Sequence, residues 1–306
     1  MKYIPETKVE LEKLVKDLSI NLGDIDTSKI TDMAGLFYLT KRTDFSGIEK
    51  WDVSKVRNMV GMFQGATSFN ADLSDWDVSN VENMNSMFSG AVSFNQDLSN
   101  WNVSNVENMS WMFCNAKSFN QDISKWNVGN VWNMYAMFHN ATSFNQPIGD
   151  WDVSKVEDMS SMFEGAESFN ADISDWNVRG VEDMESMFAY ATSFNQDISK
   201  WDVSKVEDMA SMFSEAESFN QPIGDWDVSK VENMGSMFLG AKAFNADISG
   251  WDVGSVRDMF AMFKEAISFN QNLSKWDLSK VESIDDETKD LICNGCGNVS
   301  RMKEYV

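Results

Sequence analysis

Two cysteines near the C-terminal end of the chain are the first candidates for chemistry. Cys293 and Cys296 form a C-x-x-C pair, a spacing typical of a redox dithiol or of half a zinc site. Zinc would need two more ligands, and the only other cysteine and histidine are Cys114 and His139. The 25-residue period described below places both of them roughly 30 Å or more away. We therefore expect structural or incidental thiols and no metal site, and three cysteines make no disulfide framework.

Cys114 and His139 are themselves separated by 25 residues. A thiol beside an imidazole pairs a nucleophile with a general base. Such a site also needs a third group, and no serine or second cysteine stands beside His139. We expect no catalytic residues and predict that the protein is not an enzyme.

A row of acidic or amide residues also recurs every 25 residues. Stacked carboxylates suit calcium, which takes six to eight oxygen ligands. Lysine stands three residues later in several periods and would neutralise the row, so we expect a solvated polar face and predict no cofactor. The row comprises Asp52, Asp77, Asn102, Asn127, Asp152, Asn177, Asp202, Asp227, Asp252 and Asp277, and the lysines are Lys55, Lys155, Lys205, Lys230 and Lys280.

An internal repeat positions these residues and covers most of the chain. Counted from its tryptophan as position 1, the unit reads W-[DN]-V-S-x-V-E-[ND]-M-x-x-M-F-x-x-A-x-S-F-N-x-[DP]-[IL]-S-x. The register reaches back to Ile25 through an irregular first period of 26 residues, 25–50, and it fades after Val281. A unit this short cannot bury its own apolar face, so successive units must stack. The tryptophans are Trp51, Trp76, Trp101, Trp126, Trp151, Trp176, Trp201, Trp226, Trp251 and Trp276.

Each repeat predicts a short strand followed by a short helix. Around Trp176 the pattern I-x-x-W-x-V favours a strand over positions 23 to 3. The sequence S-x-x-E that begins at Ser154 fits a helix capping box, and four apolar residues from Met159 to Ala166 follow at i, i+3, i+4 and i+7. The expected fold class is an α/β repeat solenoid, similar to leucine-rich repeats, with a parallel strand and a helix in every coil.

Two further features of the repeat predict how the coils contact one another. The tryptophan and methionine rows should form the core of the stack, because methionine suits an irregular interior. Asparagine recurs at position 20, and we expect a ladder whose side chains satisfy backbone groups of the loops. The asparagines are Asn70, Asn95, Asn120, Asn145, Asn170, Asn195, Asn220, Asn245 and Asn270.

Terminal segments should close the two ends of the stack. Residues 1–24 form the expected N-terminal cap, with an amphipathic helix over 5–18 that begins at the pair Thr7 and Glu10. Residues 25–281 form the solenoid of about ten repeats. Residues 282–306 form the expected C-terminal cap, with Leu291, Ile292 and Val299 as its apolar contacts.

The charge balance limits the partners. The 306 residues carry 48 Asp and Glu against 25 Lys and Arg, a net charge of −23, so nucleic acid should be repelled. No stretch is long and apolar enough to suggest a membrane span, and the N-terminal sequence shows no signal peptide.

Departures from the repeat point to a partner surface. Trp111 stands at position 11, where small residues are usual; Trp132 replaces glutamate at position 7; Tyr135 is at position 10. All three belong to two adjacent coils, near His139. Exposed aromatic residues are typical of protein or sugar contacts, so we predict that Trp111, Trp132, Tyr135 and His139 bind a partner.

The repeat motif resembles the 25-residue repeat of bacterial surface proteins and lipoproteins, a group related to BspA-like leucine-rich repeats. The resemblance runs from about Ile25 to Val281. It implies a right-handed solenoid, display at a cell surface or secretion, and a role in adhesion. We therefore expect a non-enzymatic binding module for a protein or glycan ligand, with self-association as a further possibility. The alternative is an intracellular protein-interaction scaffold, favoured by the absence of a visible signal peptide and by the unpaired cysteines.

Overall fold

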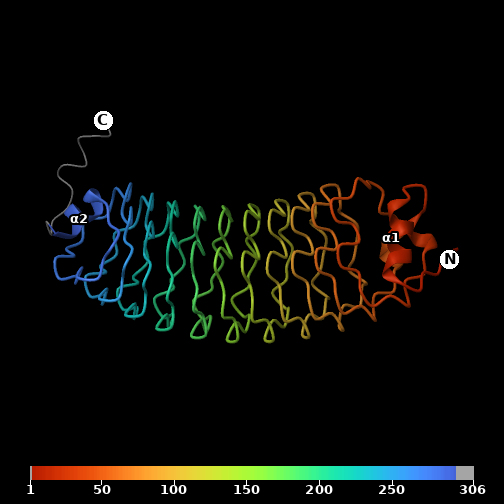
Figure 1. The fold of residues 1–306 in the computed structure, drawn as a ribbon, viewed down its shortest axis with the longest axis horizontal. Coiled ribbons are helices and arrows are strands. Elements are labelled where there is room, and N and C mark those ends of the chain that lie inside the picture. Colours follow the sequence, from red (N-terminus) through yellow and green to blue (C-terminus); the bar gives the residue numbers. More distant parts are fainter. Residues whose placement is uncertain (1, 294–306) are drawn as a thin grey trace. The chain divides into compact units, whose positions relative to one another are not determined.

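A computed structural model describes residues 2–293 of the chain. Its regular elements are the helix α1 (Lys8–Lys16), the 3₁₀ turns η1 (Leu22–Asp24) and η2 (Ile48–Lys50), and the helix α2 (Asp286–Cys293). The chain divides into two compact units, which we call unit 1 (Met1–Lys155) and unit 2 (Val156–Val306). Within each unit the coils follow one another side by side in chain order; α1 belongs to unit 1 and α2 to unit 2 (Figure 1).

The prediction of a strand and a helix in every coil is wrong. Within residues 2–293 the repeats contain no α-helix and no sheet, and their one 3₁₀ element is η2 in the irregular first period. Neighbouring coils are joined by isolated parallel bridges of one residue each, as between Asn83 and Asn108 in unit 1 or Asp183 and Asp208 in unit 2. The stack is therefore built from turns, and it is not a leucine-rich-repeat-like α/β solenoid.

The backbone at positions 9 to 16 explains why apolar residues at helical spacing do not form a helix here. In the coil that begins at Trp76, Met87 N donates to Met84 O at 3.1 Å, and Ala91 N donates to Phe88 O at 3.0 Å. These are two successive tight turns, each with a left-handed residue: Ser86 (φ 57°) and Gly90 (φ 70°). Two turns of four residues direct positions 9, 12, 13 and 16 inward, as a helix would, but positive φ at positions 11 and 15 prevents a helix.

The backbone groups between these turns bond along the stack. Ser86 N donates to Ser110 O at 2.9 Å, and Phe88 N donates to Met112 O at 2.9 Å. Each acceptor lies one coil further along the chain. These bonds between coils replace the hydrogen bonds that a helix would have made within itself.

Aspartate and asparagine side chains occupy the places where strands were expected. In the same coil, Asp77 Oδ1 accepts from Ser79 N at 3.1 Å, Asn83 Oδ1 accepts from Asn85 N at 2.9 Å, and Asp97 Oδ1 accepts from Ser99 N at 2.8 Å. These Asx turns, at positions 2, 8 and 22, bend the chain every few residues. A strand cannot extend through such bends.

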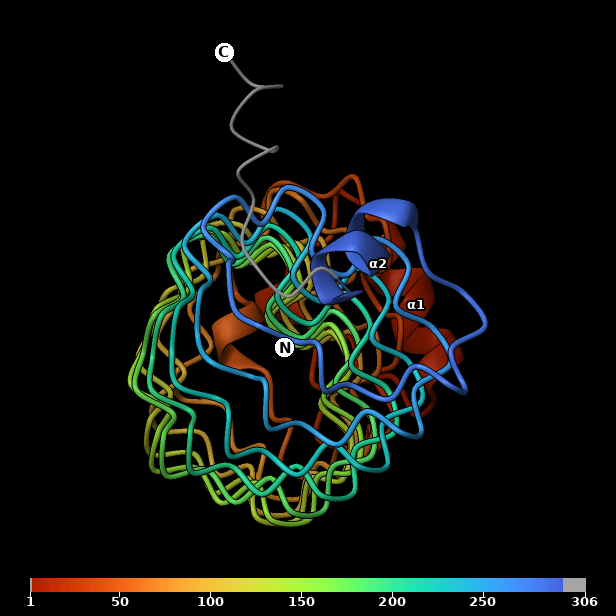
Figure 2. The same cartoon turned by 90° about the vertical axis from the view of Figure 1, so that its left-hand side faces the viewer.

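The predicted core is confirmed. All ten repeat tryptophans are buried. In unit 1 the rings of Trp101 and Trp126 stack with centroids 6.4 Å apart, and Trp126 Nε1 donates to Leu98 O at 3.0 Å. In unit 2 Trp226 and Trp251 stack at 6.5 Å. In Figure 2 the chain of unit 2, in green to blue, winds around a common interior from one coil to the next.

The predicted asparagine ladder is also confirmed. Asn120 Oδ1 accepts from Asn145 N at 2.9 Å, and Asn120 N in turn donates to Asn95 Oδ1 at 2.9 Å. Gln146 Nε2 adds a second bond to Asn120 Oδ1 at 2.8 Å. The same contacts recur in unit 2, where Asn220 Oδ1 accepts from Asn245 N at 2.8 Å. The amides thus supply the missing partners of the return loop.

In the N-terminal segment, α1 begins as predicted: Thr7 Oγ1 accepts from Glu10 N at 3.3 Å. Leu11 and Val15 are its buried residues. Nothing in the repeat pattern or its charges indicates that Arg42 holds the end of this helix. Its guanidinium donates to the carbonyl oxygens of Val15 and Asp17 at 3.1 and 2.8 Å, which are groups that a helix C-terminus leaves unpaired.

In unit 2, Asp285 connects α2 to the last full coil. Its Oδ2 accepts from Ala261 N at 2.6 Å, and its Oδ1 accepts from Thr288 N at 3.0 Å. Ile292 is buried, whereas the predicted contact Val299 lies outside the described residues. Neither helix in residues 2–293 has the length and apolar content that a membrane crossing requires.

Candidate functional site

Three of the four predicted partner-binding residues meet on the outer turns of unit 1. The rings of Trp111 and Tyr135 contact edge-on, with centroids 5.0 Å apart and planes at 82°. The His139 ring lies 6.0 Å from that of Trp111. We call Trp111, Tyr135 and His139 the aromatic cluster. All three side chains are partly exposed.

Trp132 lies apart from the aromatic cluster. Its side chain is 45% exposed, and its backbone N donates to Glu107 O at 3.0 Å in the row of position 7. Within residues 2–293 no ring contact joins Trp132 to the cluster. The four predicted residues therefore divide into a cluster of three and one separate tryptophan, which serves below as a control.

Amide side chains surround His139 and Cys114. Asn140 Nδ2 lies 3.0 Å from His139 Nε2 and donates to Asn115 Oδ1 at 3.4 Å. Asn115 Nδ2 donates to Cys114 Sγ at 3.0 Å, and the thiol is 1% exposed. These bonds hold the two amide side chains against the cluster and against the buried thiol.

Trp111 occupies a strained backbone conformation. Its φ is 59°, in the left-handed region, which costs an L-residue about 1–2 kcal/mol. Equivalent positions in the neighbouring coils hold Gly61, Ser86 and Ala136. Ser86 (φ 57°) and Ala136 (φ 50°) share the left-handed conformation, so it belongs to the repeat position, and Trp111 differs from its neighbours in the size of its side chain.

The turns around the cluster carry no formal charge. Positions 9 to 16 of four successive coils, 59–66, 84–91, 109–116 and 134–141, contain no Asp, Glu, Lys or Arg. We call these segments the neutral turn face of unit 1. The equivalent segments of unit 2 include Glu164, Glu185 and Glu215. In a chain of net charge −23, the segments that carry the cluster thus lack Asp, Glu, Lys and Arg.

The coil that precedes the Trp111 coil carries small residues at the equivalent positions. Ser86 N donates to Ser110 O at 2.9 Å and Gly90 N donates to Cys114 O at 2.7 Å, so these small residues lie directly beside the tryptophan coil. Ser86, which is buried, Ser89 and Gly90 are therefore smaller neighbours of the aromatic side chains on the next coils. We call this change in side-chain size the step, with these three small residues on its low side and the aromatic cluster on its high side.

Unit 2 has acidic residues where unit 1 has amides. At position 8, Asp158, Asp183 and Asp208 are joined by parallel bridges. Burial raises the pKa of the Asp183 carboxyl, and the negative charges of Asp158 and Asp208 raise it further. The hydrogen bond that Asp183 accepts from Glu185 N acts in the opposite direction. Burial, together with Asp208, Asp183 and Glu164, likewise raises the pKa of Glu185.

Replacing Asp183 by asparagine is expected to stabilise unit 2. A raised carboxyl pKa means that the charged form weakens the fold: stability falls as pH rises from about 4 through the folded-state pKa and stays lower at neutral pH. Asp183→Asn should raise the free energy of unfolding at pH 7 by up to about 1 kcal/mol, the size of cross-strand charge pairs. In urea titrations at several pH values, the gain should vanish below about pH 4.

Asp202→Asn is the matched control in the same unit. Hydrogen bonds from the hydroxyl and backbone N of Ser204 lower the pKa of Asp202, so its charge stabilises the fold above the ordinary carboxyl pKa. This variant should gain no stability at pH 7. Equal gains in the two variants would show that general charge reduction, and not the buried row, is responsible.

The position 2 row, considered above for calcium, has a local structural role. Its side-chain oxygens accept from the backbone two residues later, as Asp152 Oδ1 does from Ser154 N at 3.1 Å. The Lys155 ammonium donates to Asn130 Oδ1 at 2.7 Å. Within residues 2–293 no group of three or more His, Cys, Asp or Glu side chains is arranged to hold a metal ion.

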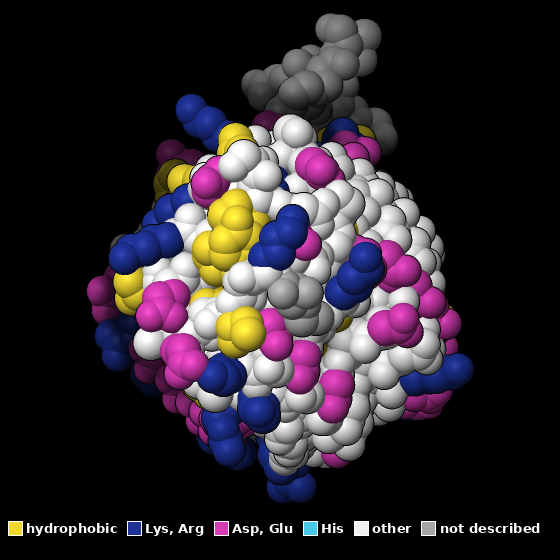
Figure 3. Space-filling view, turned by 90° about the vertical axis from the view of Figure 1, so that its right-hand side faces the viewer, with side chains coloured by type: hydrophobic (Ala, Val, Ile, Leu, Met, Phe, Trp, Pro, Cys, Tyr) yellow, Lys and Arg dark blue, Asp and Glu magenta, His cyan; other side chains and the backbone are white. Residues whose placement is uncertain are grey.

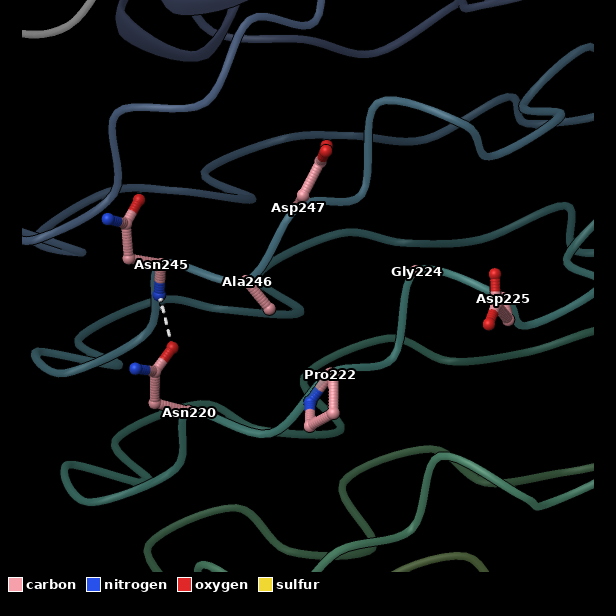
Figure 4. Close-up of a pocket in the computed structure, with 7 residues that line it drawn as sticks. All are labelled: Asn220, Pro222, Gly224, Asp225, Asn245, Ala246 and Asp247. Carbon is pink, nitrogen blue, oxygen red and sulfur yellow. Dashed lines mark hydrogen bonds between the residues drawn. The ribbon is translucent and has the colours of Figure 1, made fainter.

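Unit 2 contains a shallow hollow of about 380 Å³ next to its asparagine ladder. Pro222 and Gly224 replace the aspartate and serine of the usual turn, and a Cβ at Gly224 would lie 2.3 Å from Asp247 O. Gly224 thus lies at a close approach of two coils beside the hollow. Figure 4 shows that the carboxylates of Asp225 and Asp247 lie apart and do not point toward one another, so they form no catalytic pair.

Two other surfaces carry exposed reactive or apolar groups. At the N-terminal end of unit 1, hydrophobic side chains lie among charged ones (Figure 3); the exposed residues of this segment include Ile4, Val9 and Leu18. In unit 2 the thiol of Cys293 is exposed. Its predicted partner Cys296 lies outside the described residues.

The chain matches a family of tandem repeats. The family described as Mycoplasma protein of unknown function, DUF285, matches residues 9–122, 95–201 and 191–291. Comparison with curated proteins gives no match. The expected resemblance to a bacterial repeat family is thus supported, whereas nothing here supports the relation to BspA-like leucine-rich repeats. Because these matches cover most of its length, the chain belongs to the DUF285 repeat family.

Proposed function

We propose that this protein is a non-enzymatic binding and adhesion module, displayed at a cell surface, whose partner contacts the aromatic cluster of unit 1. The observation that carries the proposal is Trp111. It places a large, partly exposed side chain at a position where the neighbouring coils hold Gly61, Ser86 and Ala136, and the fold gains no buried core residue from it. A large aromatic side chain that adds nothing to the core is typical of a residue that contacts a partner.

The arrangement of the cluster supports a binding role. Tyr135 and His139 contact Trp111, and the stacked backbone of two adjacent coils fixes all three. Aromatic residues on a rigid support are typical of binding hot spots, because they supply a large contact area at little entropic cost. The acidic character of the chain disfavours nucleic acid as the partner.

The resemblance to bacterial surface repeats supports the proposed location. An intracellular scaffold would use the same cluster, so localisation needs its own experiment. Antibody labelling of intact cells that express the protein, before and after mild surface proteolysis, separates the two. Labelling that proteolysis removes is expected; labelling only after permeabilisation would favour the intracellular scaffold.

Binding is tested with combined protein and glycan arrays. The double variant Trp111→Ser, Tyr135→Ser should lose at least one saturable ligand of the wild-type chain while keeping its melting temperature. Trp132→Ala, which changes an exposed tryptophan outside the cluster, should keep that ligand. If the double variant is folded and binds every ligand as the wild type does, the cluster is not the contact surface.

A further inference from the structure

We propose that the step beside Trp111 binds an uncharged sugar unit of a glycan. This inference rests on the proposed function and adds the chemical class of the ligand. The step has the aromatic cluster on its high side, which we call the wall, and Ser86, Ser89 and Gly90 on its low side.

The wall suits the apolar face of a sugar ring. A pyranose presents C–H groups on its faces and hydroxyl groups at its edge, so it packs against an aromatic plane while its rim remains polar. The planes of Trp111 and Tyr135 meet at 82°, which makes a corner instead of a flat patch. A corner of two rings contacts a compact ring ligand on two sides and excludes water from both.

The polar groups around the wall suit hydroxyl groups. Serine and tyrosine hydroxyls and asparagine amides each provide both donors and acceptors, and a sugar hydroxyl also does both. Asn115 and Asn140 are held by bonds to Cys114 and His139, so binding would immobilise few side chains. Such preorganisation lowers the entropic cost of association.

The neutral turn face favours an uncharged ligand over a charged one. The four segments contain no Asp, Glu, Lys or Arg, so within them a sulfate or carboxylate would find only the His139 imidazole as a basic group in exchange for its lost hydration. The net charge of −23 would also repel an anionic glycan. A basic peptide would find opposite charges at position 8 of unit 2, where Asp158, Asp183 and Asp208 lie, and not on the neutral turn face.

The test uses an array of neutral oligosaccharides built on glucose, galactose, mannose and N-acetylglucosamine, together with their sialylated and sulfated counterparts. The full chain should bind at least one neutral oligosaccharide more tightly than its charged counterparts. Trp111→Ser should raise the Kd for that oligosaccharide by about tenfold or more, as expected for an aromatic hot spot, measured by titration calorimetry.

Two controls keep the outcomes distinct. Trp111→Ser introduces the residue that Ser86 provides one coil earlier, so its melting temperature should stay equal or rise; Trp132→Ala should leave the Kd unchanged. Preference for charged glycans, or binding unchanged in Trp111→Ser, overturns the inference. If only a protein ligand depends on the cluster, the glycan assignment fails and the proposed function stands; if no ligand depends on it, both fail.

Discussion

Replacing Trp126 by alanine is expected to lower the free energy of unfolding by about 3–5 kcal/mol. The Trp126 side chain is 3% exposed, its ring stacks on Trp101 at 6.4 Å, and it lies 6.2 Å from the Phe113 ring. Alanine would leave a cavity between coils that cannot collapse, because neighbouring coils fix the spacing. It would also leave Leu98 O without the bond at 3.0 Å from the indole, a loss of about 1–3 kcal/mol.

Trp132→Ala provides the matched control in the same coil. This tryptophan is 45% exposed and lies outside the buried core, so its loss should change stability by less than about 1 kcal/mol. Urea unfolding followed by far-UV circular dichroism measures both variants. Trp126→Phe should fall between them, since it keeps a ring but loses the donor. Comparable losses for Trp126→Ala and Trp132→Ala would contradict the division into inner and outer tryptophans.

The sequence predicts which residues point inward more reliably than it predicts the backbone that turns them inward. A strict period of 25 residues fixes the stacking register, so the burial of tryptophan and the asparagine ladder follow without knowledge of φ and ψ. Met84, Met87, Phe88 and Ala91 are all buried, as either a helix or a pair of turns would require. The spacing alone cannot separate the two structures.

Glycine provided the signal that would have separated them. Gly65 and Gly90 stand at position 15 in successive coils, and both have positive φ. Glycine that recurs at one position of a predicted helix argues against that helix, because its interior disfavours glycine. At other coils the same position holds Asn115 or Asn140, residues that also tolerate the left-handed region.

The candidate site could be predicted only in part. Trp111, Tyr135 and His139 belong to adjacent coils, and the repeat register alone places them near one another. Trp132 belongs to the same coil as Tyr135 and His139, so the repeat register groups it with them as well. In the observed turns, position 7 precedes the Asx turn at Asn133, and this bend separates Trp132 from the ring contacts.

Gly47→Ala is expected to have the largest effect of any glycine substitution in the N-terminal part of unit 1. Gly47 precedes η2 with φ 95°, and a Cβ at this residue would lie 2.1 Å from Gly23 N and 2.5 Å from Gly23 Cα. The left-handed conformation costs alanine about 1–2 kcal/mol. The forced backbone shift costs a further 1–3 kcal/mol or so, because η1 also holds the Leu22 carbonyl that accepts from Trp51 Nε1 at 2.9 Å.

Gly35→Ala separates these two causes. Gly35 also has positive φ, 65°, but a Cβ there would meet no atom within 4 Å, so only the conformational cost of about 1–2 kcal/mol should appear. Urea midpoints give both losses of stability, and hydrogen exchange should show that Gly47→Ala exposes residues 22–24 first. If both variants lose the same free energy, the close approach of η1 and η2 does not constrain the fold, and the N-terminal segment is held to the first coil mainly by Arg42 and the buried face of α1.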